Sequence, residues 1–273
     1  MKSILVASDL SARSDRAIRR AAQLAHQHNA ALTVLTVVDD DLPPAAATAF
    51  EATARETLND LVTSLDATDA VTMVQLGDPV ETIVATAEEL DVDMLVMGTH
   101  KVRPFWDMFA GTTMERVVRA TTRPVLLVKN PAAGPYESVL CGIDLSPSCV
   151  AAANMAARLA PEAHFTAFHA IHVPYQGFIS AHHSVEGLAP FVDEAAKELD
   201  GWWKTAGISD KIAKPPVVPD SVTDVFETTS KAVSADLFAL GAHGRPVFAP
   251  TLLGSFTEAQ IRNPACDVLI SRR

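Results

Sequence analysis

Glycine and serine residues with a phosphate-binding spacing lie near the C-terminal end of this 273-residue sequence. Gly241, Gly244 and Gly254 follow the pattern G-x2-G-x9-G, and Ser255 comes directly after the last glycine. Glycine lets the backbone turn with positive φ and lets an anion approach the amides, and the N-terminus of a helix attracts negative charge. Because residues 256–262 can begin such a helix, the stretch predicts a phosphate site to which Ser255 adds a hydroxyl donor.

An earlier stretch has the same layout with one substitution. Gly98 and Gly111 stand at the first and last glycine positions, but Lys101 replaces the middle glycine. A long side chain at this position is expected to hinder close approach of an anion to the backbone, whereas its ammonium group could reach a phosphate as a point charge. The sequence leaves open whether this stretch holds a ligand.

The two stretches belong to an internal repeat. The segment ILVASDLS at 4–11 matches VLCGIDLS at 139–146, and later segments match in the same order. Residues 129–138 are rich in proline, glycine and alanine, which is typical of a connector. The sequence therefore predicts two tandem domains, residues 1–130 and residues 137–273, here called the first and the second repeat.

Each repeat alternates short apolar runs with longer helical patterns. Runs such as residues 31–38 are rich in Val, Leu and Thr without polar alternation, which is typical of parallel strands covered on both faces. This alternation predicts an α/β fold with an open parallel sheet, right-handed crossovers and ligands at the carboxyl ends of the strands. Asp9 and Asp144 follow the first strand of each repeat, where a carboxylate can accept a hydrogen bond from a ribose or amino group.

The composition excludes several classes of partner. Acidic residues outnumber basic ones, 33 to 22, for a net charge of −11, and the basic residues form no run, so a sequence-independent grip on nucleic acid or anionic lipid is not expected. The three cysteines are scattered, which indicates reduced core thiols. Since no apolar run reaches about 18 residues, we expect a cytoplasmic protein with no membrane and no nucleic-acid partner.

Taken together, these features are similar to the universal stress protein family. The family signature combines a strand ending V-x-x-D-x-S, a later D-x-(hydrophobic)3-G-x-H-G-R, the glycine motif above and a terminal P-V-L strand, and these occur here in order over nearly the whole chain twice. The resemblance implies two five-stranded, Rossmann-like α/β domains of the adenine nucleotide α-hydrolase type. It also implies that the repeats pair through their last strands as an intramolecular pseudo-dimer.

The resemblance further implies which residues hold an adenine nucleotide. In the second repeat, Asp144 serves the adenosine end, residues 241–245 the ribose-phosphate turn and residues 254–256 the phosphates. The implied set in the second repeat is Asp144, Ala170, Gly241, His243, Gly244, Arg245, Gly254, Ser255 and Phe256. The corresponding set in the first repeat is Asp9, Val37, Gly98, His100, Lys101, Gly111, Thr112 and Thr113. The first set departs from the family pattern at Lys101 and at Val102, which replaces the arginine.

The function implied by this resemblance is a stress response in which ATP, alone or with Mg²⁺, is a regulatory ligand held mainly by the second repeat, in a homodimer of two-domain chains. A slow ATP hydrolase and a nucleotide-free interaction scaffold stay open as alternatives. The sequence shows no Walker-type lysine and no catalytic carboxylate near the phosphates, so no catalytic residue is assigned. His100 and His243 are interpreted as turn histidines that bond to the backbone.

Four histidines in or beside the insertion at residues 173–190 raise the hypothesis of a zinc site. They are His169, His172, His182 and His183. Their spacing fixes no ligand geometry, and two residues three apart on a strand face opposite sides. We therefore assign no metal site.

Overall fold

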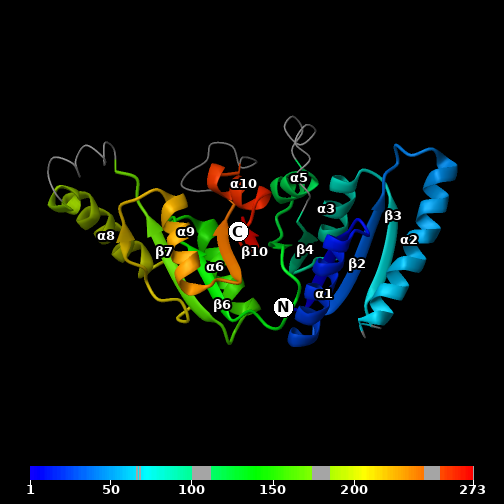
Figure 1. Ribbon diagram of the computed structural model, residues 1–273, viewed down its shortest axis with the longest axis horizontal. Helices are drawn as coiled ribbons and strands as arrows, with labels where there is room; N and C mark the ends of the chain where they lie inside the picture. The colour runs from blue at the N-terminus through cyan, green and yellow to red at the C-terminus, as the bar shows by residue number, and fades with distance from the viewer. Residues whose placement is uncertain (66, 68, 100–111, 174–184, 243–252, 273) are drawn as a thin grey trace. The chain divides into compact units, whose positions relative to one another are not determined.

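The computed structural model describes residues 1–65, 67, 69–99, 112–173, 185–242 and 253–272. The chain forms two compact units (Figure 1). Unit 1 comprises the described residues of Met1–Pro135, Thr251–Leu253 and Glu258–Ile270, and unit 2 comprises those of Tyr136–Pro250, Gly254–Thr257 and Ser271–Arg273. The last strand of the second repeat therefore belongs largely to unit 1.

Unit 1 is built on a sheet whose strands from the first repeat are all parallel, in the order β3-β2-β1-β4-β5. Its strands are β1 (Ser3–Ser8), β2 (Ala31–Val38), β3 (Val71–Leu76), β4 (Met94–Gly98), β5 (Val125–Val128) and the added β10 (Asp267–Ser271). Its helices are α1 (Ala12–His28), α2 (Pro44–Ser64), α3 (Pro79–Glu89) and α5 (Thr113–Ala120). The antiparallel pairing of β10 with β5 joins the last strands of the two repeats, as the resemblance implies.

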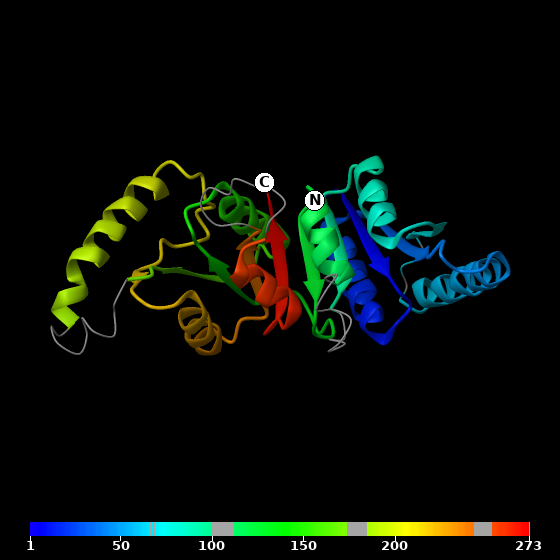
Figure 2. The same ribbon diagram turned by 90° about the horizontal axis from the view of Figure 1, so that it is seen from above.

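Capping residues start and stop the helices of unit 1. The Ser11 side chain accepts a hydrogen bond from the Ser14 amide at the start of α1, and Asn29 ends the helix in the left-handed conformation. Asp78 caps α3 in the same way and is followed by Pro79 at the first helical position. Figure 2 shows α1 and α3 on opposite sides of β1, so the sheet is covered on both faces.

Unit 2 repeats this pattern with parallel strands in the order β9-β6-β7-β8. Its strands are β6 (Ser138–Gly142), β7 (His164–Ala170), β8 (Val217–Val218) and β9 (Leu237–Gly241). Its helices are α6 (Pro147–Leu159), the short 3-10 helix η1 (Val185–Leu188), α8 (Ala189–Trp203), α9 (Val222–Val233) and α10 (Ser255–Arg262), the last of which continues into unit 1.

The core of each unit lies along its central strands. All four residues of β5 and all five of β9 are buried, which explains why these runs are apolar throughout instead of alternating. The predicted parallel α/β fold is confirmed, and the strands predicted at residues 31–38 and 71–76 have the same bounds in the structure. Among the helices that the structure describes, none is long and apolar enough to cross a bilayer.

Candidate functional site

The turn after β1 places Asp9 at the carboxyl edge of the sheet. Its Oδ1 accepts a hydrogen bond from the Ser11 amide at 3.0 Å and another from the Ser14 hydroxyl. Burial raises the pKa of Asp9, but the hydrogen bonds from Ser11 and Ser14 outweigh it, so the pKa lies below the ordinary value and the carboxyl is ionised at neutral pH. Leu10 between them has a φ of 59°, a strained value for leucine that this turn requires.

A pocket of about 250 Å³ opens beside this turn. Asp9, Val37, Gly98 and Thr113 line it, so four of the first-repeat residues predicted to bind a nucleotide meet at one cavity. Thr112 is buried next to Thr113 without lining the pocket. The other predicted members, His100, Lys101 and Gly111, lie outside the described residues.

Gly98 is required for packing at the end of β4. A Cβ built on Gly98 would lie 2.8 Å from the Arg13 carbonyl oxygen and 3.1 Å from the Ser14 amide nitrogen, closer than side chains tolerate. Gly241 occupies the same place in the second repeat, where a Cβ would lie 2.6 Å from the Ser148 hydroxyl. Both glycines therefore let a strand end press against the first turn of a helix, a need that sequence reasoning had assigned to the ligand.

The start of α5 is held by a capping box. The Glu115 amide donates to the Thr112 hydroxyl at 3.2 Å, and the Thr112 amide donates to Glu115 Oε2 at 3.4 Å. Glu115 is completely buried and also pairs with Arg262 of α10, whose pKa its carboxylate raises. Thr112, predicted to contact phosphate, thus has its hydroxyl and amide engaged within the protein.

The turn after β6 in the second repeat has the same form. Asp144 Oδ1 accepts from the Ser146 amide at 3.0 Å, and Leu145 has a φ of 63°, matching Leu10. Cys149 lies beside Asp144 where the first repeat has Ser14; burial, followed by the nearby Asp144 charge, raises the pKa of this thiol to about 12, so it stays protonated. The two repeats therefore build one turn with different chemistry behind the aspartate.

The remaining second-repeat residues lie in several places. Ala170 ends β7 and is half-buried, and Gly254 donates its amide to the Ala242 carbonyl at 3.2 Å. The Ser255 side chain is exposed at the start of α10. The Phe256 ring packs against the Phe226 ring with their centroids 5.5 Å apart, so the Phe256 side chain is part of the core. Predicted residues His243, Gly244 and Arg245 lie outside the described residues.

The histidines near the insertion have separate surroundings. His169 is buried in β7, and its Nδ1 lies 2.7 Å from the Ile143 carbonyl oxygen, so a hydrogen bond to the backbone accounts for this ring nitrogen. His172 is exposed just beyond the strand. His182 and His183 lie outside the described residues. In the described part of the chain, the cluster of potential metal ligands is the exposed run Asp39–Asp41.

Arg13 and Ser14 are among the residues of the first-repeat pocket that sequence reasoning missed. The signal that could have found them is the repeat itself: Arg13 aligns with Ser148 and Ser14 with Cys149 when Asp9 is matched to Asp144. A residue that differs between copies beside a shared turn is a candidate for a function peculiar to one copy.

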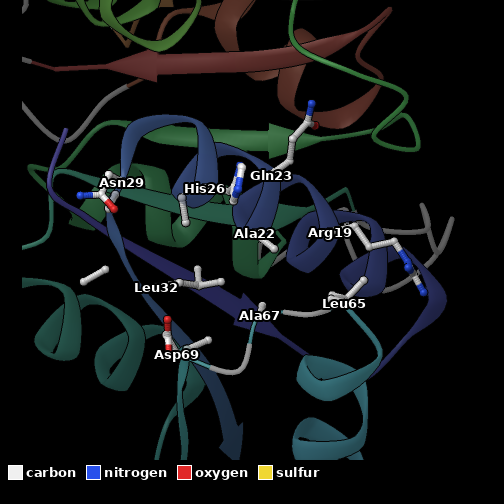
Figure 3. A pocket seen from close by; sticks show the side chains of 13 residues that line it. Arg19, Ala22, Gln23, His26, Asn29, Leu32, Leu65, Ala67 and Asp69 are labelled. Carbon is white, nitrogen blue, oxygen red and sulfur yellow. The ribbon is translucent and has the colours of Figure 1, made fainter.

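A larger cavity, of about 720 Å³, lies at the other edge of the sheet (Figure 3). It is placed between α1 and the segment before β3, next to Leu32 at the start of β2, and is backed by alanines such as Ala22 and Ala67. Its polar residues Arg19 and Asp69 are exposed. Because ligands of open parallel sheets bind at the carboxyl ends of the strands, size alone does not make this cavity the functional site.

The sheet order, the crossovers and the acidic turns at the strand ends define a Rossmann-like α/β protein of the class that binds ligands at this edge. The model of the universal stress protein family matches residues 1–129 and again residues 135–272, so the chain belongs to that family as a tandem two-domain member.

Individual relatives agree with this assignment. Universal stress protein A homolog 1 of Coxiella burnetii is 30% identical over 139 residues, which are 46% of this chain and 95% of that protein. The crystal structure of a universal stress protein from Archaeoglobus fulgidus superposes with a TM-score of 0.70 at 18% identity and covers 99% of this chain and 98% of its own. A putative universal stress protein from Pseudomonas aeruginosa gives 0.62 at 19% identity, covering 100% and 93%. At these identities the two structures show the fold alone.

Proposed function

We propose that this universal stress protein binds ATP, or a related adenine nucleotide, as a regulatory ligand, and that the triphosphate is held mainly by the second repeat, residues 137–273. Family membership supports a stress-response role. The intact G-x2-G-x9-G-S motif in the second repeat supports the choice of repeat.

The observation that carries the proposal is the pocket of the first repeat. Asp9, Val37, Gly98 and Thr113 come from four separate segments of the chain, and folding brings them around one cavity of about 250 Å³. The equivalent positions of the second repeat occupy the same strand ends and helix start, with Asp144 in the same turn geometry as Asp9. This correspondence supports a site of the same kind in the second repeat, where the glycine motif is intact.

The start of α10 adds a further argument for triphosphate binding in the second repeat. Ser255 makes no side-chain hydrogen bond with the part of the chain that the structure describes, and its side chain is exposed at a helix N-terminus. An exposed hydroxyl at the N-terminus of a helix suits an anionic ligand. Among the described residues, the nearest atom to a Cβ built on Gly254 is the Thr257 hydroxyl oxygen at 3.8 Å, an ordinary van der Waals distance.

Isothermal titration calorimetry of the full chain with ATP tests the proposal. The wild type should bind, and Gly254→Val should bind at least roughly tenfold more weakly, because it places a branched side chain where phosphates would approach the amides. Gly134→Val is the control, since Gly134 lies outside the glycine motif and an added Cβ there meets no described atom within 4 Å. Absence of ATP binding by the wild type, or equal affinity of the Gly254→Val variant, would contradict the proposal.

We also propose a cytoplasmic homodimer. Its three cysteines are free and buried, which suits a reducing compartment. Phe191 is 43% exposed on α8, and Trp202 and Trp203 are half-buried on the same helix, which offers apolar surface for association. Light scattering on the eluted protein should give twice the 29.1 kDa mass of one chain, and a single-chain mass would refute the dimer.

A further inference from the structure

Arg13 gives the pocket of the first repeat a positive charge that the second repeat lacks. It lines the pocket from the first turn of α1, and it makes no hydrogen bond and no ion pair with any residue that the structure describes. The equivalent position in the second repeat is Ser148, which is buried and lies 2.9 Å from the Ser146 hydroxyl. In a chain with a net charge of −11, a cavity-lining guanidinium that has no partner among the described residues suits an anionic ligand.

Asp9 places a second condition on that ligand. Its hydrogen bonds with Ser11 and Ser14 both use Oδ1, so with respect to the described residues Oδ2 can accept from a ligand. A molecule that fills this pocket must therefore present a hydrogen-bond donor to Asp9 and an anion to Arg13. A nucleoside with a phosphate meets both conditions, because its base and ribose donate and its phosphate accepts.

The start of α5 limits how many phosphates fit. In the first repeat the Glu115 carboxylate already accepts from the Thr112 amide, and Glu115 is fully buried there by its pairing with Arg262. An extended phosphate chain running to this helix would meet a carboxylate that already occupies the amide of the N-cap residue. The cavity volume of about 250 Å³ is also below the roughly 300–1,000 Å³ of common small-molecule sites.

We infer that the first repeat binds a nucleotide with a single compact phosphate, and that Arg13 binds this phosphate. The inference rests on the proposed function, since it assumes nucleotide binding at this edge of the sheet. It assigns a different ligand to each repeat. The second repeat takes the triphosphate at α10, and the first takes a monophosphate at the start of α1.

Calorimetric titrations of the full chain with adenosine, AMP and ATP test this division. Arg13→Gln should weaken AMP binding by roughly 10- to 100-fold, as expected for loss of a charged hydrogen bond, and Arg13→Lys should restore part of it. Adenosine binding should be the same in the wild type and Arg13→Gln, because adenosine has no phosphate. Arg19→Gln is the matched control, an exposed arginine of the same helix that lies outside this pocket.

The two proposals fail in different ways. Unchanged AMP affinity in Arg13→Gln, equal losses for adenosine and AMP, or no AMP binding by a wild type that binds ATP would overturn the role of Arg13. ATP binding that is unchanged in Gly254→Val would overturn the assignment of ATP to the second repeat. The role of Arg13 would then still be decided by the AMP titration. A wild type that binds none of the three ligands would overturn both.

Discussion

Gly98 and Gly241 illustrate how a single residue type can serve packing and binding at once. Each ends a strand against the first turn of a helix, with no room for a Cβ beside Arg13 in one repeat or Ser148 in the other. The close approach draws the helix N-terminus to the strand end, which is the place where the pocket forms. In the first repeat, a glycine needed for geometry therefore also brings the pocket-lining residues together.

Replacing Gly98 with alanine should destabilise the protein by about 1–3 kcal/mol, as overpacking of a tight site does. Gly142→Ala is the matched control, since Gly142 also ends a strand but an added Cβ would meet the Phe238 ring at an ordinary 3.5 Å. Urea denaturation followed by circular dichroism measures both variants. Equal midpoints for Gly98→Ala and the wild type would show that the backbone of Arg13 moves aside without cost.

Among the elements, α5 and α10 begin in different ways despite their matched sequences. The box of Thr112 and Glu115 closes the start of α5, whereas Glu258, the repeat equivalent of Glu115, pairs with Arg119 at 2.6 Å. The glutamate at this position thus caps the start of α5 in the first repeat, whereas in the second repeat it forms an ion pair with Arg119. This difference underlies the assignment of distinct ligands to the two repeats.

Thr112→Ala should lower the free energy of unfolding by about 1 kcal/mol, the usual loss for a helix N-cap. The neighbouring Thr113→Ala should change it little, because Thr113 is exposed and makes no side-chain hydrogen bond with described residues. Thermal unfolding of both variants compares them directly. A larger loss in Thr113→Ala than in Thr112→Ala would refute the capping box.

At the scale of the whole molecule, the physical units differ from the sequence repeats. Residues 258–270 come from the second repeat but belong to unit 1, where β10 pairs with β5. Two ion pairs, Glu115–Arg262 and Arg119–Glu258, accompany this exchange and are reciprocal, since each glutamate pairs with the arginine of the other repeat. Such reciprocity is typical of a two-fold symmetric interface, which points to an origin as a dimer of single repeats.

The two ion pairs should contribute unequally. Arg262→Ala should cost about 1–3 kcal/mol because it leaves the buried Glu115 carboxylate without its cation, although the exposure of the Arg262 side chain, 54%, keeps the cost below that of a fully buried pair. Arg119→Ala should cost about 0–1 kcal/mol, because its partner Glu258 is 29% exposed and keeps contact with water, unlike the buried Glu115. Chemical denaturation distinguishes the two, and a greater loss in Arg119→Ala would show that Glu115 is not held by Arg262.

Much of this architecture was predictable because it depends on patterns along the chain. The runs at 31–38 and 71–76 are rich in Val, Leu and Thr over the length of a strand, and the Asp-Leu-Ser turns carry their own caps. The neighbours of Arg13 in the sequence do not show that its turn packs on Gly98, and only the comparison with Ser148 of the other repeat marks it out. Glu115 likewise reads as an ordinary exposed helix glutamate, yet it is fully buried.

The sequence by itself determined the duplication, the parallel α/β fold and the edge of the sheet at which a ligand is expected, because strand and helix periodicity and turn residues act over short stretches of chain. Only the tertiary structure decided that β10 joins unit 1, that Glu115 and Arg262 meet, and that Asp9 and Arg13 line one cavity. The reason is physical: burial, ion pairing and cavity shape depend on which distant segments pack together, and contacts across more than a hundred residues leave no periodic trace in the order of the residues.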